Sequence, residues 1–237
     1  MNFCKNCNTE ISGNYCSTCG QPAKLKRIDA HYIFHEIEHV LHFDKGILFT
    51  IKELLLRPGQ IIREFINENR GRLVKPILFI ILSSIIFTIT SHFFNIKDGY
   101  IKFEEAEKTA VTTIFTWVGN HYGYTNIIIG IFIAFWLKLF YKKYGYNFFE
   151  ILILLCFVEG IGMLLLSVFA LLEGVTKFHL MQVSGIVFFI YTTWAIGQFF
   201  DERKATSYIK AFTAYVLGMI SFAFSAIIIG YICDYFI

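Results

Sequence analysis

The sequence predicts an all-α integral membrane helical bundle of about five spans, preceded by cytosolic amphipathic helices and a small cysteine-rich module at the N-terminus. The first observation is composition, because 56% of the residues are hydrophobic and only 16% are charged. The second is a mean hydropathy of +0.57. Soluble domains are about a quarter charged, so this much apolar surface requires lipid as part of the solvent. The third is a pair of cysteine knuckles close to the first residue.

Residues 1–22 are the first predicted domain. Its two Cys-x2-Cys knuckles, Cys4/Cys7 and Cys16/Cys19, are separated by eight residues. Zinc takes four ligands in a tetrahedron, with sulfur about 2.3 Å from the metal, and each knuckle supplies two of them. No apolar leader precedes the first cysteine, so we expect a cytosolic N-terminus, where a reducing environment favours metal over disulfides. The pattern therefore predicts a zinc ribbon with structural Zn²⁺.

Two readings of this ribbon are open. In the first, the zinc only holds the fold together, because four thiolates leave no coordination position for water. In the second, the ribbon also binds a protein partner or senses zinc or redox state. We favour the structural reading for the metal itself.

Residues 23–75 are predicted to form cytosolic, membrane-proximal amphipathic helices. Apolar residues recur at helical spacing after Asp29, from Ile47 to Leu56, and from Ile61 to about Asn69. Charges interrupt every apolar run, so no span fits here. We expect these helices to lie on the bilayer with their apolar stripes toward lipid.

Residues 76–237 are predicted to form the transmembrane bundle. A span needs about 20 mostly apolar residues. Lysine and arginine are richer before the first span and after the second and fourth than in the alternate loops, which predicts an N-terminus inside and a C-terminus outside. The predicted spans are Pro76–Phe94, Asn126–Tyr141, Phe148–Leu172, Leu180–Phe200 and Ile209–Phe236.

A histidine-rich segment contains a motif typical of metalloproteases. His35, Glu36 and His39 match H-E-x-x-H, in which two histidines bind zinc and the glutamate is the base. Glu38 places a charge where such helices are usually uncharged, and no companion ligand follows before the first span. We favour a solvated or interfacial helix. The alternatives are a membrane metalloprotease and a weak metal or pH-sensitive site on His31, His35 and His39, which share a helix face.

Glu159 lies near the middle of the third predicted span. An ionisable residue at that depth costs about 2.5 kcal/mol or more, and is a functional candidate for an ion, proton or substrate. The structural alternative is a hydrogen bond to the fourth span, through Tyr191–Thr193. Gly160 and Gly162 beside it would let another helix approach closely.

Several short motifs outside the ribbon are typical of one family. They are Asp44-Lys45-Gly46, Leu54-Leu55, Arg57-Pro58-Gly59, Ile62-Arg63-Glu64-Phe65 and Lys75-Pro76. With the ribbon, they resemble the uncharacterised bacterial membrane family called domain of unknown function 3667. The resemblance implies a protein of the bacterial cytoplasmic (inner) membrane that has a zinc ribbon and no known catalysis. The five-span layout is more weakly similar to Yip1-type membrane proteins.

These observations predict a non-enzymatic membrane protein with an interaction, regulatory or envelope-organising role, whose partners are the lipid bilayer and a protein bound through the ribbon. Nucleic acid is not an expected partner, because the formal net charge is only +3. The alternatives are a small-molecule or ion transporter using Glu159, and a metalloprotease using His35, Glu36 and His39.

Overall fold

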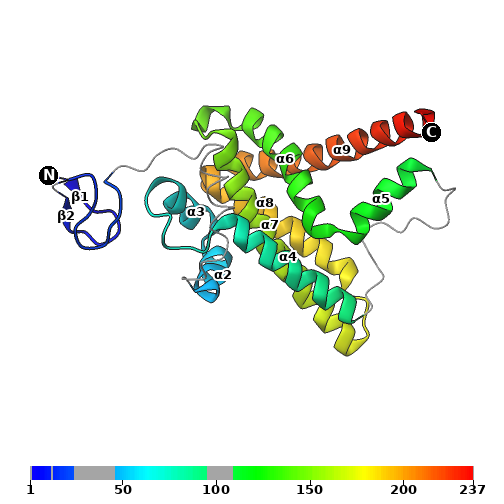
Figure 1. The fold of residues 1–237 in the computed structure, drawn as a ribbon, viewed down its shortest axis with the longest axis horizontal. Helices are drawn as coiled ribbons and strands as arrows, with labels where there is room; N and C mark the ends of the chain where they lie inside the picture. The colour runs from blue at the N-terminus through cyan, green and yellow to red at the C-terminus, as the bar shows by residue number, and fades with distance from the viewer. Residues whose placement is uncertain (1, 12, 24–45, 95–108, 237) are drawn as a thin grey trace.

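A computed structural model describes residues 2–11, 13–23, 46–94 and 109–236 (Figure 1). The described elements are β1 (Asn2–Phe3), β2 (Glu10–Ile11), α2 (Ile47–Leu56), α3 (Pro58–Asn67), α4 (Pro76–Phe93), α5 (Ala110–Asn120), α6 (Tyr122–Phe140), η1 (Lys142–Tyr144), α7 (Phe148–Thr176), α8 (Met181–Asp201) and α9 (Ala205–Phe236). The helix predicted after Asp29, with His31, His35, Glu36 and His39, lies outside the described residues.

Helix α7 is the centre of the helical body. It packs against α4, α6 and α8, and the two short helices α2 and α3 contact it at one end. Helix α9 leaves this body and runs outward with α5 and α6 beside it (Figure 1). The apolar window of α7 is 72% buried inside the protein, whereas that of α9 is 17% buried. The apolar surface of α9 therefore needs an apolar environment outside the protein.

Local sequence signals explain where several helices begin. Pro58 and Pro76 occupy the first turns of α3 and α4, where a missing N–H leaves no hydrogen bond unmade. Asn147 precedes α7 and forms a capping box with Glu150, whose N–H donates to the Asn147 side chain at 2.8 Å. This reciprocal pair satisfies two of the backbone donors that a helix start leaves open.

Four described helices are long and apolar enough to cross a membrane: Pro76–Phe93, Phe148–Thr176, Met181–Asp201 and Ala205–Tyr235. They confirm the predicted multi-pass helical class. The remaining predicted span, Asn126–Tyr141, coincides with α6, whose described apolar part, Thr125–Phe140, is shorter. The predicted span Ile209–Phe236 lies within α9, which begins one helical turn earlier, at Ala205.

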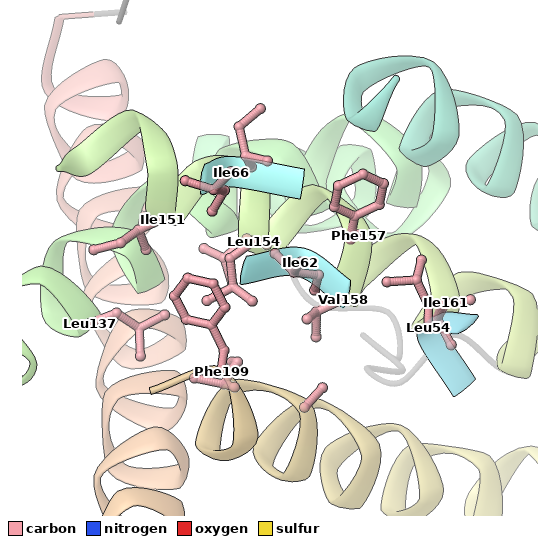
Figure 2. Close-up of a cluster of buried hydrophobic side chains, with 14 of the residues drawn as sticks. Leu54, Ile62, Ile66, Leu137, Ile151, Leu154, Phe157, Val158, Ile161 and Phe199 are labelled. Atoms are coloured by element: carbon pink, nitrogen blue, oxygen red, sulfur yellow. The ribbon is translucent and has the colours of Figure 1, made fainter. Parts of the chain in front are cut away.

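One hydrophobic cluster joins the short helices to the spans (Figure 2). Ile62 and Ile66 of α3 are buried among α7 residues such as Leu154 and Val158. Phe65 of α3 meets Phe157 edge to face, with ring centroids 5.2 Å apart. The apolar stripe of α3 thus packs against protein, and the prediction that it faces lipid was wrong. The stripe's period was right, but helical spacing does not say which apolar surface it covers.

Helix α2 differs from α3 because it has two apolar faces. Leu54 is buried in the core, while Leu48, Leu55 and Leu56 are exposed. The exposed leucines are a surface that lipid can cover at the membrane interface. We call α2 and α3 together, residues 47–67, the α2–α3 platform.

Candidate metal site, buried glutamate and platform contacts

The two cysteine knuckles are built on the same backbone pattern. The Cys4 N–H donates to the Thr9 carbonyl at 2.8 Å, and the Cys16 N–H donates to the Gln21 carbonyl at 2.8 Å. Asn8 and Gly20, each one residue after a knuckle, have φ of 61° and 72°. Glycine and asparagine are the residues that adopt this left-handed conformation most readily. The repeated turn leaves both thiols of each knuckle on one side.

The four thiols converge on one point. The Sγ atoms of Cys4 and Cys19 are 3.5 Å apart, and those of Cys7 and Cys16 are 3.4 Å apart. All four lie within 4.8 Å of one another. A tetrahedron with metal–sulfur bonds of about 2.3 Å has sulfur–sulfur edges of about 3.8 Å. The predicted ligands therefore form a cluster of the right size for a four-coordinate metal ion.

The environment of Cys7 favours its thiolate. A hydrogen bond with the Thr9 hydroxyl, 3.3 Å away, is the main cause that lowers the Cys7 pKa to about 6. A backbone hydrogen bond at Thr9 acts in the same direction. Since only the thiolate ligates metal, this local chemistry prepares the site for binding. Cys156 and Cys233 lie far along the chain in helices α7 and α9 and do not belong to this cluster.

The ribbon contacts the helical body at the end of α3. The Gln21 side chain donates to the Glu68 carbonyl at 2.5 Å. The Asn69 amide donates to Asn6 Oδ1 at 2.5 Å. Both contacts are exposed polar hydrogen bonds, and each is typically worth about 1 kcal/mol. The metal site is thus positioned beside the platform by weak contacts, not by a shared apolar core.

Glu159 is buried inside the body, with 2% of its surface exposed. Its Oε1 accepts a hydrogen bond from the Tyr215 hydroxyl of α9 at 2.9 Å. Its Oε2 has no hydrogen-bond partner among the described residues. A buried polar atom without a hydrogen-bond partner destabilises the folded state by about 1–3 kcal/mol. The carboxyl group of Glu159 therefore lowers the stability of the core.

The partner of Glu159 differs from the one that the sequence suggested. The predicted donors were Tyr191–Thr193 of α8, but the Tyr191 hydroxyl donates to the Leu54 carbonyl of α2 at 3.1 Å. Thr192 donates to the Phe189 carbonyl in its own helix. The prediction was wrong because α9 packs against α8 and α6, and the long tyrosine side chain reaches Glu159 of α7 from there.

The glycines beside Glu159 act in helix packing, as predicted. A Cβ on Gly160 would lie 2.6 Å from the Phe79 ring of α4. A Cβ on Gly162 would overlap the Phe188 ring of α8. These two glycines let α4 and α8 approach α7 on either side of the buried carboxyl group.

The platform is fastened to the end of α8 by residues of the Arg-Pro-Gly segment and the turn that follows. A Cβ on Gly59 would lie 2.6 Å from the Gln198 carbonyl oxygen and the Phe199 nitrogen. The Arg63 guanidinium donates to the Gln198 carbonyl at 2.5 Å and the Phe199 carbonyl at 2.9 Å. These carbonyls lie in the last turn of α8, where they have no partner within the helix. The Arg63 charge also suits a helix C-terminus.

A second fastening lies on the α2 side of the platform. The Val74 N–H donates to the Thr50 hydroxyl at 3.1 Å inside the protein. Sequence reasoning used the Arg-Pro-Gly segment only as a turn signal and missed these roles. The available signal was a residue without a side chain, Gly59, four positions before a long cation, Arg63, at the start of the predicted helix. Residues at this spacing share one face of a helix.

The fold and the thiol cluster define the class: a helical protein with the features of a multi-pass membrane protein and a four-cysteine candidate metal site. Residues 44–88 match the family model described as "Protein of unknown function (DUF3667)", which confirms the resemblance seen in the sequence. The match covers α2, α3 and most of α4. No curated protein and no solved structure matches the chain, so the similarity to Yip1-type proteins stays a prediction.

Proposed function

We propose that this is a non-enzymatic protein of the bacterial inner membrane that presents a zinc ribbon to a protein partner on the cytosolic face. The observation that carries the proposal is the closed set of four thiols, which all lie within 4.8 Å of one another. Four sulfur ligands satisfy zinc completely and leave no position for a substrate. The N-terminus is cytosolic and the C-terminus outside in this arrangement, as the lysine and arginine distribution favours.

The ribbon has an exposed apolar surface that suits a partner. Phe3 and Tyr15 are 57% and 66% exposed, on a module with very few residues to form a core. Aromatic residues are enriched in protein interfaces. The platform next to the ribbon is held rigidly by Gly59 and Arg63, so a partner bound to the ribbon would be held at the membrane surface.

A site-specific crosslinking experiment tests the proposal. A photo-crosslinking amino acid at Tyr15 in the full chain is expected to capture a discrete partner in cells, whereas the same amino acid at exposed Lys142 is not. The product should disappear in Cys7→Ser and persist in the matched variant Cys233→Ser. Elemental analysis should find one zinc per chain, lost in Cys7→Ser. If the crosslinked product at Tyr15 is unchanged in Cys7→Ser, the partner does not depend on the folded ribbon and the proposal is contradicted.

A transport function centred on Glu159 is the second candidate. The observation that favours it is the buried Oε2 without a partner among the described residues, which a transported cation or proton could satisfy. Glu159→Gln would then abolish an uptake or efflux phenotype at unchanged abundance. An unchanged phenotype in Glu159→Gln leaves the carboxyl group with a structural role.

A further inference from the structure

A large cavity opens between the helical body and the outward-running helices. Its volume is about 1280 Å³, at or above the upper end of the roughly 300–1,000 Å³ of typical ligand sites. Its walls come from α5, α6, α7, α8 and α9. Three of these helices, α7, α8 and α9, are long and apolar enough to span a membrane. The cavity is therefore at the depth of lipid acyl chains.

The middle of the cavity is apolar. Its lining there includes Ile186, Phe188, Phe189, Met219 and Phe222. Of the deeper polar side chains, Tyr215 donates to Glu159 and Thr125 donates to the Val118 carbonyl, whereas the buried Thr193 hydroxyl has no hydrogen-bond partner among the described residues. The site therefore offers hydrocarbon contacts along most of its length.

The cavity is elongated along α8. It is lined from Met181 to Trp194 of that helix, which corresponds to about 20 Å at 1.5 Å per residue. A single leaflet of the hydrocarbon core is about 15 Å thick, half of the whole. An extended acyl chain would lie along this wall without leaving the apolar region.

One end of the cavity is polar and carries a single fixed charge. Glu173, His179 and Gln182 line it where α7 turns into α8. Among the described lining residues, Glu173 is the only Asp, Glu, Lys or Arg. The Met181 N–H donates to Glu173 Oε2 at 2.7 Å, which holds the carboxylate at the start of α8. The lining at this end therefore has a carboxylate and no lysine or arginine among the described residues, and the exposed Lys177 of the same loop does not line the cavity.

We propose that this cavity binds one amine-bearing zwitterionic phospholipid, a phosphatidylethanolamine, with an acyl chain along α8 and α9 and its ammonium group at Glu173. The acyl chain matches the apolar, elongated wall. The ammonium matches the one fixed charge at the polar end, and an anionic head group would meet a carboxylate there. The proposal does not depend on the metal site or on its partner, because none of the residues that line the cavity belongs to the ribbon or to the platform.

Native mass spectrometry of the delipidated full chain tests the proposal. The protein receives equal amounts of phosphatidylethanolamine and phosphatidylglycerol in mild detergent. We expect one lipid to be retained, with phosphatidylethanolamine preferred about fivefold, the ratio for about 1 kcal/mol from one charge near a membrane surface. Glu173→Gln keeps an oxygen to accept from Met181 and is expected to bring the preference to about one.

Two tryptophan variants of α9 test the location of the site. Ala223 lines the cavity, and Ala223→Trp should reduce the retained lipid, because an indole group there obstructs the apolar wall. Ile228 is exposed on the same helix and does not line the cavity, so Ile228→Trp should retain the lipid. If Ala223→Trp does not fold, the comparison of the wild type with Glu173→Gln still decides the proposal.

Three results would overturn the proposal. The first is no retained lipid in the wild type, and the second is a head-group preference that Glu173→Gln does not change. The third is a dimer of the wild type that Ala223→Trp disrupts, because the cavity would then be an interface between two copies of the chain.

Discussion

The ribbon and the helical body of this protein are stabilised by different interactions. In the ribbon, the described buried side chains are the two thiols Cys4 and Cys16, and the sheet is a single pair of two-residue strands. In the body, a continuous apolar cluster runs from Leu54 of α2 through α7 to Tyr215 of α9. One region is built around four thiols that could hold a metal ion, and the other around the packing of many apolar side chains.

This difference predicts which changes destabilise each region. A module without an apolar core gains its folding free energy from metal binding. A packed bundle loses stability when a close helix contact or a buried hydrogen bond is disturbed. The two regions should therefore respond independently, because the hydrogen bonds that join them in the described residues, such as Gln21 with Glu68, are exposed and polar.

Removal of the metal should have the largest effect and should be confined to the ribbon. Structural zinc contributes about 10–16 kcal/mol to the folding of small modules. After chelation, hydrogen exchange should show that residues 2–23 lose amide protection while α7 and α8 keep theirs. Protection of residues 2–23 that survives chelation would contradict the metal-dependent fold.

Gly59→Ala should have the largest effect on the body. The new Cβ would meet the backbone of Gln198 and Phe199, which cannot move aside as a side chain can. Overpacking of this kind costs about 1–3 kcal/mol, and thermal unfolding in detergent should show a lower midpoint with unchanged zinc content.

Gly130→Ala is the matched control for that variant. A Cβ at Gly130 in α6 would meet nothing within 4 Å, and alanine stabilises a helix interior by about 0.5–1 kcal/mol relative to glycine. Equal loss of stability in Gly59→Ala and Gly130→Ala would show that the α3–α8 contact is not the cause.

Tyr215→Phe should destabilise the body by about 1–3 kcal/mol, because it removes the hydrogen bond to Glu159 Oε1 and leaves that buried acceptor without its donor. The double variant Glu159→Leu with Tyr215→Phe should recover most of the loss, since an apolar pair often replaces a buried polar one at little cost. Thermal unfolding of the wild type and the two variants measures this. A double variant that is less stable than Tyr215→Phe would show that the carboxyl group itself stabilises the fold.

Thr9→Val should produce the smallest effect, a shift in the pH at which the ribbon releases its metal. The Cys7 pKa is lowered from 9.0 to about 6, with the hydrogen bond to the Thr9 hydroxyl as the largest of several causes, so the folded ribbon favours the thiolate. That contribution is complete above pH 9.0 and is lost as the pH falls through about 6. Without the hydroxyl, the Cys7 pKa rises, and protons should displace the metal at a higher pH.

A pH titration of zinc retention measures the shift, with Thr18→Val in the other knuckle as control. The expected order is release from Thr9→Val first as the pH is lowered, followed by Thr18→Val and the wild type together. Identical release from all three proteins would show that the Thr9 hydroxyl does not act on the site.

Features encoded by neighbouring residues were predicted well. The spacing of Cys4, Cys7, Cys16 and Cys19 predicted the thiol cluster that the structure contains. The apolar period predicted α2 with its bounds, Ile47–Leu56. Helix α3 was predicted from Ile61 but begins at Pro58. Proline fits the first turn of a helix, because its missing N–H would have no partner there. Local pattern is sufficient here, since a metal turn and a helix are both specified within a few residues.

Contacts between distant segments were not predictable in the same way. Tyr215 is 56 residues from Glu159, and Arg63 is 136 residues from the Phe199 carbonyl that it contacts. The sequence is equally compatible with a hydrogen bond from α8 to Glu159, because α8 also carries hydroxyl groups at that depth. The packing of α9 against α6 and α8 is what brings Tyr215 to Glu159.

The sequence by itself determined a helical membrane protein with a four-cysteine cluster, because composition, helical period and ligand spacing are local properties. The tertiary structure decided that the apolar stripe of α3 covers α7 and α8, that Gly59 and Arg63 fasten the platform to the end of α8, and that a cavity is left between the body and α9. These outcomes depend on which apolar surfaces meet, and apolar side chains have the same pattern whether they face protein or lipid.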